Sequence, residues 1–140
     1  MNLNRNATLA EVGEFPLIAA ITQGLSLAPD VSVGPGDDAA VLMIEDAVAT
    51  SVDVLVEGVH FRRDWCEARD VGRKAVAVNV ADIEAIGARA TGLLVGFSAP
   101  ADLTLGWVLD FVDGLGEEGK AAEVSLLGGD VTRARDITIA

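Results

Sequence analysis

An apolar helical segment, residues 74–83, constrains the fold of this chain more than any other feature. Its sequence, KAVAVNVADI, is apolar on nearly every side of a helix, and such a helix is expected to be buried nearly all round. Asn79 and Asp82 interrupt the segment, and their spacing puts them on one side of the helix. A buried carboxylate needs a partner. A divalent cation is one candidate partner for Asp82, and a salt bridge to Lys74 or Arg73 is the structural alternative.

Further aspartates lie in turns, at the ends of predicted strands or within them, in a chain whose net charge is −12. They are Asp37, Asp38, Asp53 and Asp130. Carboxylates that converge without counter-charge repel one another and lose hydration on burial, so this placement favours bound cations. Because the chain has one His and one Cys, we expect oxygen ligands, which suit Mg²⁺, Mn²⁺ or Ca²⁺ rather than zinc. The sequence therefore predicts a metal-dependent phosphate site.

Length, charge and composition narrow the class of protein. At 140 residues the chain fits one domain, and its hydrophobic content of 51% indicates a surface that is buried against another subunit. The strong negative charge argues against nucleic acid and anionic membranes as partners.

No apolar run reaches the ~20 residues that a membrane span needs, and residues 1–11 lack an export signal, so we expect a cytoplasmic protein. Cys66 is expected to be an ordinary reduced thiol with no catalytic role.

Periodicity and turn residues predict an α+β fold of order ββαβαβ. Helical spacing of apolar residues predicts a first helix over residues 13–25. Two β-branched runs, 39–44 and 47–56, are predicted to pair as strands across a tight turn at 45–46. The remaining predicted elements are a helix over 68–88, a strand over 91–98, a helix over 101–122, a strand over 123–127 and a last strand over 136–140.

These elements predict a mixed or antiparallel sheet with helices on one face. The free face of such a sheet has to be covered, and a second copy of the chain would account for the apolar excess. The last predicted strand has no turn or cap after it, so the sequence reads as cut rather than finished.

Two glycine-rich stretches are candidate phosphate sites. Gly-Pro-Gly at 34–36 precedes Asp37 and Asp38, and Gly128-Gly129 precedes Asp130 at the end of a predicted strand. Glycines allow backbone amides to approach a phosphate, while the carboxylates could hold a metal. Either stretch, taken alone, is also consistent with a plain solvated turn.

Two further candidates lie near the second predicted strand. Alternation puts Ser51 and Asp53 on one face of that strand, for which a solvated edge strand is the structural alternative. His60 follows in a loop at the same end of the sheet and could hydrogen-bond a substrate, although a lone His beside Phe61 is more often a packed or surface residue.

Four motifs together resemble the thiamine-monophosphate kinase family, in the family's order and at its spacing. They are GDDAAVL at 36–42, DVLVEGVHF at 53–61, AVNVADI at 77–83 and GGDVTR at 128–133, and GEF at 13–15 is similar to the family's opening. The resemblance covers essentially all 140 residues. The family belongs to the aminoimidazole-ribonucleotide-synthetase-like superfamily, whose members bind ATP between two domains and dimerise by joining amino-terminal sheets into a barrel.

The resemblance implies that residues 1–140 are an amino-terminal ATP- and Mg²⁺-binding and dimerisation domain, with the family's carboxy-terminal domain absent from this chain. The implied reaction transfers the γ-phosphoryl group of ATP to thiamine monophosphate, with several Mg²⁺ ions bridging the phosphates and no covalent nucleophile. One alternative is another ATP-using enzyme of the same superfamily. Another is a noncatalytic metal-binding and dimerisation fragment, because residues 1–140 alone are expected to show little activity.

The resemblance also assigns residues by motif. The implied metal ligands are Asp38, Ser51, Val52 through its main-chain carbonyl, Asp53, Asp82 and Asp130. Gly129 and Asp130 would lie against ATP, and His60 would contact the substrate. Asp37 is a candidate for an outer position around the metals. Val52 stands where the family has Ser or Thr, and Ala134 stands where it has Gly, so Arg133 receives no role.

Overall fold

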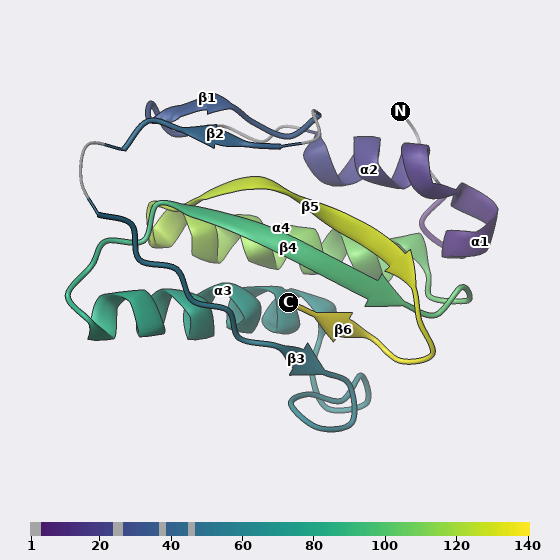
Figure 1. Ribbon diagram of the computed structural model, residues 1–140. Helices are drawn as coiled ribbons and strands as arrows, with labels where there is room; N and C mark the ends of the chain where they lie inside the picture. The colour runs from purple at the N-terminus through teal and green to yellow at the C-terminus, as the bar shows by residue number, and fades with distance from the viewer. Residues whose placement is uncertain (1–3, 24–26, 37–38, 45–46) are drawn as a thin grey trace.

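The computed structural model describes residues 4–23, 27–36, 39–44 and 47–140 (Figure 1). The described residues form both helices and strands, as expected of an α+β fold. They are α1 (Leu9–Val12), α2 (Glu14–Thr22), β1 (Val31–Val33), β2 (Val41–Leu42), β3 (Leu55–Val56), α3 (Ala68–Ala85), β4 (Gly92–Ala99), α4 (Leu105–Ala121), β5 (Ser125–Arg133) and β6 (Thr138–Ile139).

A mixed sheet forms the centre of the structure, as the sequence predicted. Its strand order is β3-β6-β4-β5, in which β4 and β5 are parallel and the other two pairs are antiparallel. The long helices α3 and α4 lie along one face of this sheet (Figure 1). Phe97 of β4 packs against Trp107 and Phe111 of α4, with ring centroids 6.4 and 5.4 Å away. The predicted sheet with helices on one face is therefore confirmed.

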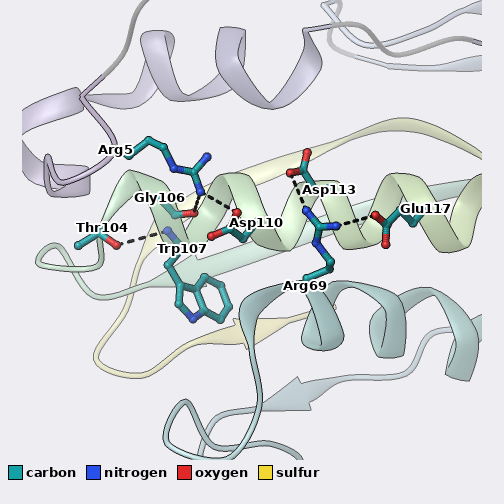
Figure 2. Close-up of polar contacts among 8 residues, drawn as sticks. All are labelled: Arg5, Arg69, Thr104, Gly106, Trp107, Asp110, Asp113 and Glu117. Carbon is teal, nitrogen blue, oxygen red and sulfur yellow. Dashed lines mark hydrogen bonds and ion pairs between the residues drawn. The ribbon is translucent and has the colours of Figure 1, made fainter.

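The two long helices approach closely because glycines face the neighbouring backbone. A Cβ atom at Gly72 of α3 would collide with the carbonyl oxygen of Phe111, and one at Gly114 of α4 would collide with that of Arg69. Arg69 also bonds Glu117 of α4 at 2.9 Å (Figure 2). The interface between α3 and α4 thus combines close backbone contacts at two glycines with an exposed ion pair.

The amino-terminal segment is tied to the same helix. Arg5 donates to the Asp110 carboxylate at 2.6 Å and to the Gly106 carbonyl at 3.1 Å (Figure 2). Thr104 caps α4, because its hydroxyl accepts a hydrogen bond from the Trp107 N–H at 3.3 Å. This cap explains why α4 begins at Leu105 and not near residue 101, where the apolar pattern placed it.

The predicted pairing of residues 39–44 with residues 47–56 is wrong. In the structure β2 pairs with β1, an antiparallel strand that the sequence analysis did not predict, and β3 pairs with β6. Residues 47–54 form no strand and run beside α3, where a helix side chain takes the place of a strand partner. The predicted turn at 45–46 lies outside the described residues.

Strand β5 is longer than predicted. It extends from Ser125 to Arg133, whereas the apolar run indicated a strand over 123–127. Each residue from Gly128 to Arg133 is paired with a residue of β4, so Gly128, Gly129 and Asp130 lie within the strand and not in a turn after it. The parallel partner β4, which is distant in the sequence, stabilises this glycine-rich stretch as a strand.

The prediction that α3 is buried nearly all round is also wrong. Its buried residues are on one side, namely Ala68, Val71, Gly72, Ala75, Val76 and Val80. Ala77, Ala81 and Asp82 are exposed, because the sheet and α4 cover only one side of the helix. Of the helices in the described ranges, none has both the length and the apolar character needed to cross a membrane.

Candidate functional site

Four of the polar residues singled out from the sequence meet on one side of α3. The Asp53 backbone N–H donates to the Asn79 side-chain oxygen at 2.8 Å. The Asn79 amide nitrogen in turn donates to the Ala75 carbonyl of its own helix at 2.9 Å. Three residues further along α3, the Asp82 carboxylate accepts a hydrogen bond from the Ser51 hydroxyl at 3.3 Å. Residues 51–53, called the acidic segment below, are thus attached to the helix that carries Asp82.

The salt-bridge alternative for Asp82 is not what the structure contains. Arg73 pairs with Glu118 at 3.4 Å, and Lys74 donates to the His60 carbonyl at 2.6 Å. Asp82 is exposed, so burial does not require it to have a charged partner. Its described partner, Ser51, is neutral. The negative charge of Asp82 is therefore available to a cation.

The donors at this site fit a cation that is shared with phosphate. Within residues 4–23, 27–36, 39–44 and 47–140, no three His, Cys, Asp or Glu side chains lie close enough to form a metal cage by themselves. Mg²⁺ is typically held by one or two carboxylates together with phosphate oxygens and water. Asp53, Asp82 and the Ser51 hydroxyl supply hard oxygen donors of that kind. Asp37 and Asp38 lie outside the described residues.

Asp130 is separated from this group by two strands. It pairs with Gly96 of β4, which exchanges hydrogen bonds of 2.8 and 2.9 Å with Ala140 next to β6. Strand β3 lies beyond β6 and begins two residues after Asp53. Three inter-strand spacings of ~4.8 Å amount to about 14 Å. The structure therefore does not bring Asp130 into direct contact with Asp53, and only an extended ligand could reach both.

A largely apolar cavity of about 500 Å³ lies beside Asp130, between α2, α4, β4 and β5. Gly128, Gly129, Asp130 and Val131 line its strand side, and the other walls include Ile18, Val108, Phe111, Val112 and Leu115. Its volume is within the range of small-molecule sites. Gly129 also has a packing role, because a Cβ atom there would collide with the Val95 backbone of β4.

His60 lies in the loop that follows β3. Its Nδ1 accepts a hydrogen bond from the Val56 backbone N–H at 3.0 Å, and the His60 backbone N–H donates to the Val56 carbonyl at 2.9 Å. In the described part of the chain Nε2 has no hydrogen-bond partner, so this nitrogen is the one available to a ligand. The imidazole is therefore oriented by Val56, the last residue of β3.

Comparison with known proteins identifies the family. The family described as AIR synthase related protein, N-terminal domain, has a model that matches residues 36–140. The chain belongs to this family. That membership confirms the superfamily indicated by the four motifs.

Several curated relatives of this AIR synthase related domain carry the name thiamine-monophosphate kinase. The thiamine-monophosphate kinase of Mycobacterium tuberculosis strain CDC 1551 is 45% identical over 129 residues, which are 91% of this chain and 39% of the relative. The crystal structure of thiamine-monophosphate kinase from Stenotrophomonas maltophilia K279a is 33% identical, with a TM-score of 0.72 over 87% of this chain and 38% of that one. The chain thus spans about two fifths of the length of these relatives.

A third relative was solved with ligands. The structure named AaThiL complexed with AMPPCP and TMP is 29% identical, with a TM-score of 0.63 over 97% of this chain and 42% of that one. The resemblance to thiamine-monophosphate kinase is confirmed by these three proteins.

Sequence reasoning missed several parts of the site in this AIR synthase related domain. Helix α2 and the inner side of α4 form walls of the cavity, but their apolar residues have no feature that separates a ligand wall from an ordinary core. Lys74 was considered only as a partner for Asp82, whereas it binds the His60 loop. Asn79 was noted for sharing a side with Asp82, but its contact with the Asp53 backbone depends on how the chain folds back.

Proposed function

We propose that this chain is the ATP-binding part of a thiamine-monophosphate kinase. The reaction transfers the γ-phosphoryl group of ATP to thiamine monophosphate and yields thiamine diphosphate. The relatives' name supports this activity, as does the AaThiL structure with AMPPCP and TMP. The observation that carries the proposal is the convergence of Ser51, Asp53, Asn79 and Asp82 on one side of α3.

In this proposal ATP lies against β5 on the side of the sheet that faces α4. The cavity between α2 and α4 takes the adenine base, since its walls are mainly apolar and its volume is about 500 Å³. Gly129 and Asp130 lie against the nucleotide at the strand side of the cavity. The triphosphate then extends from Asp130 toward Asp53 and Asp82, a separation that an extended ligand can bridge.

The acidic residues hold the phosphates through Mg²⁺, of which we propose several. Bound Mg²⁺ supplies positive charge that offsets the phosphate oxygens in a chain of net charge −12. Ser51, Asp53 and Asp82 form one part of the ligand set, with the exposed Val52 contributing its main-chain carbonyl. Asp130 forms another part at the nucleotide. Asp38 completes the proposed set from outside the described residues.

No covalent nucleophile is part of the proposed mechanism. Phosphoryl transfer depends mainly on positioning the two substrates in line and on stabilising charge. Asn79 contributes by holding the Asp53 backbone, and His60 contributes by presenting Nε2 to thiamine monophosphate. Further binding groups come from the part of the enzyme that corresponds to the rest of the relatives' length.

We further propose that the enzyme acts in the cytoplasm, where ATP is available. We also propose that it is a homodimer, in which the sheet faces turned away from α3 and α4 join into a barrel. Leu94 of β4 is 66% exposed on the face opposite Phe97. Val52 and Met43 are also about 70% exposed. Exposed large apolar side chains of this kind favour association. Sedimentation of the chain at high concentration should give a dimer, and a monodisperse monomer would contradict this part of the proposal.

The experiment that tests the activity uses the intact protein that contains residues 1–140. It is incubated with ATP, Mg²⁺ and thiamine monophosphate, and thiamine diphosphate is measured by chromatography. Stoichiometric formation of thiamine diphosphate and ADP is the expected result. Turnover with a different phosphate acceptor only would identify another enzyme of the superfamily. Nucleotide binding with no turnover of any acceptor would favour a noncatalytic module.

A further inference from the structure

Lys74 connects α3 to the loop that carries His60. Its ammonium group donates to the His60 main-chain carbonyl at 2.6 Å, a short hydrogen bond from a charged donor. The end of β3 orients the imidazole, because the Val56 N–H donates to Nδ1 at 3.0 Å. Lys74 therefore holds the backbone of the residue whose side chain is oriented by Val56.

The carboxy-terminal half of α3 holds residues 51–53. Asn79 binds the Asp53 backbone and Asp82 binds the Ser51 hydroxyl. Lys74 and Asp82 are eight positions apart in the sequence, which corresponds to about 12 Å along a helix that rises 1.5 Å per residue. One rigid helix thus sets the spacing between the acidic segment and the His60 loop.

We propose that Lys74 is a positioning residue for the acceptor substrate. By holding the His60 carbonyl it fixes where Nε2 meets thiamine monophosphate, relative to the end of α3 where the phosphates are held. This inference rests on the proposed function, because it assumes that His60 contacts the acceptor. It assigns to Lys74 no contact with ATP.

The rest of the loop is anchored independently of Lys74. Phe61 is 5% exposed and belongs to the core, and Arg63 forms an ion pair with Glu57. The Glu57 backbone N–H also donates to the carbonyl of Ile137, next to β6, at 2.9 Å. Loss of the Lys74 ammonium is therefore expected to release the His60 carbonyl while the loop and the fold persist.

Lys74→Met keeps the aliphatic stem and removes the donor, and Lys74→Arg keeps a charged donor. Arg73→Met is the matched control, because Arg73 is the adjacent residue on α3 and pairs with Glu118 of α4. In the intact enzyme we expect Lys74→Met to raise KM for thiamine monophosphate about tenfold, the scale of one hydrogen bond to a charged group, and to leave KM for ATP unchanged. Lys74→Arg should recover part of the loss, and Arg73→Met should leave both KM values unchanged.

A second readout does not depend on activity. His60 is the only histidine of the chain, so its imidazole C–H resonances are unambiguous in NMR spectra of residues 1–140 prepared without a histidine tag. We expect these resonances to shift or broaden in Lys74→Met and to stay in place in Arg73→Met. Unchanged His60 resonances in Lys74→Met would overturn the inference.

The kinetic outcomes separate this inference from the proposed function. Absence of thiamine diphosphate formation by the wild-type enzyme would overturn the proposed function. Turnover by the wild type with the same KM for thiamine monophosphate in Lys74→Met would overturn the role of Lys74 alone. An equal rise in KM for ATP and for thiamine monophosphate would show a general charge effect and would also overturn it.

Discussion

The side-chain oxygen of Asn79 accepts a hydrogen bond from the backbone N–H of Asp53 at 2.8 Å, so a helix side chain holds the acidic segment in place. The Asn79 amide nitrogen is used as well, because it donates to the Ala75 carbonyl at 2.9 Å. Asn79 needs both an acceptor and a donor to form these two bonds. This arrangement explains how residues 51–53 lie beside α3 without a strand partner.

Replacing Asn79 with Ala should weaken both the fold and nucleotide binding. The Asp53 N–H loses its acceptor, and we expect the free energy of unfolding to fall by about 1–2 kcal/mol. Affinity for Mg²⁺-ATP should fall in parallel, because Asp53 is no longer held beside Asp82. Urea denaturation and calorimetric titration measure the two effects. Glu84→Gln on the same helix is the control and should change neither; a normal ATP affinity in Asn79→Ala would exclude this role.

The contact between α3 and α4 predicts opposite effects for two neighbouring glycines. Gly114→Ala places a Cβ atom against the Arg69 carbonyl, and overpacking of this kind should cost about 2 kcal/mol. Gly116 is on the same helix with open space around it, so Gly116→Ala should stabilise by about 0.5–1 kcal/mol. Denaturant titration compares both variants with the wild type. Equal effects of the two substitutions would mean that the helices do not approach as described.

The cap at the start of α4 predicts a loss that depends on the hydroxyl group. Thr104→Ala removes the acceptor for the Trp107 N–H and should lower the free energy of unfolding by about 1 kcal/mol. Thr104→Ser keeps the hydroxyl and should recover most of that loss. Thermal unfolding of the three proteins provides the comparison. If Ser and Ala have the same effect, the hydroxyl does not form the cap.

The capping box at α1 predicts an acid-dependent contribution to stability. Hydrogen bonds from the Thr8 backbone N–H and hydroxyl lower the pKa of the Glu11 carboxyl. Because the folded pKa lies below the unfolded one, the stabilisation is fully present above the ordinary Glu value of about 4.3 and is lost as the pH falls through the folded pKa. The difference in unfolding free energy between wild type and Glu11→Gln should therefore shrink between neutral pH and about pH 3. A constant difference over that range would contradict the assignment.

Local sequence patterns identified the long elements well. The apolar periodicity of α3 and α4 and the apolar run of β4 are each long enough to determine the type of element. Their ends were less accurate, since α4 begins at the Thr104 cap and α3 ends at Ala85. Strands were correctly predicted within residues 39–44 and 136–140, where β2 and β6 lie. The pairing of the short strands was mispredicted, because it depends on partners distant in the sequence: β3 pairs with β6, across more than eighty residues.

The site was anticipated in part. The three-residue spacing of Asn79 and Asp82 on a helix is a local feature, and it correctly put both on one side, which the structure shows to be the side that contacts residues 51–53. The inference that Asp82 is buried failed, because alanines such as Ala77 and Ala81 can be exposed at little cost and so do not indicate a buried face. The distance between Asp130 and Asp53 follows from strand order, which periodicity does not contain.

The central claim is that acidic side chains from separate elements hold ATP phosphates through divalent cations. The most direct test is a crystal structure of the intact protein with AMPPCP and Mn²⁺, whose anomalous signal locates the ions. The proposal predicts anomalous peaks within about 2.5 Å of Asp53 and Asp82 oxygens and of phosphate oxygens, with Asp130 against the nucleotide. Nucleotide bound at a site away from these three aspartates, with peaks elsewhere, would contradict it.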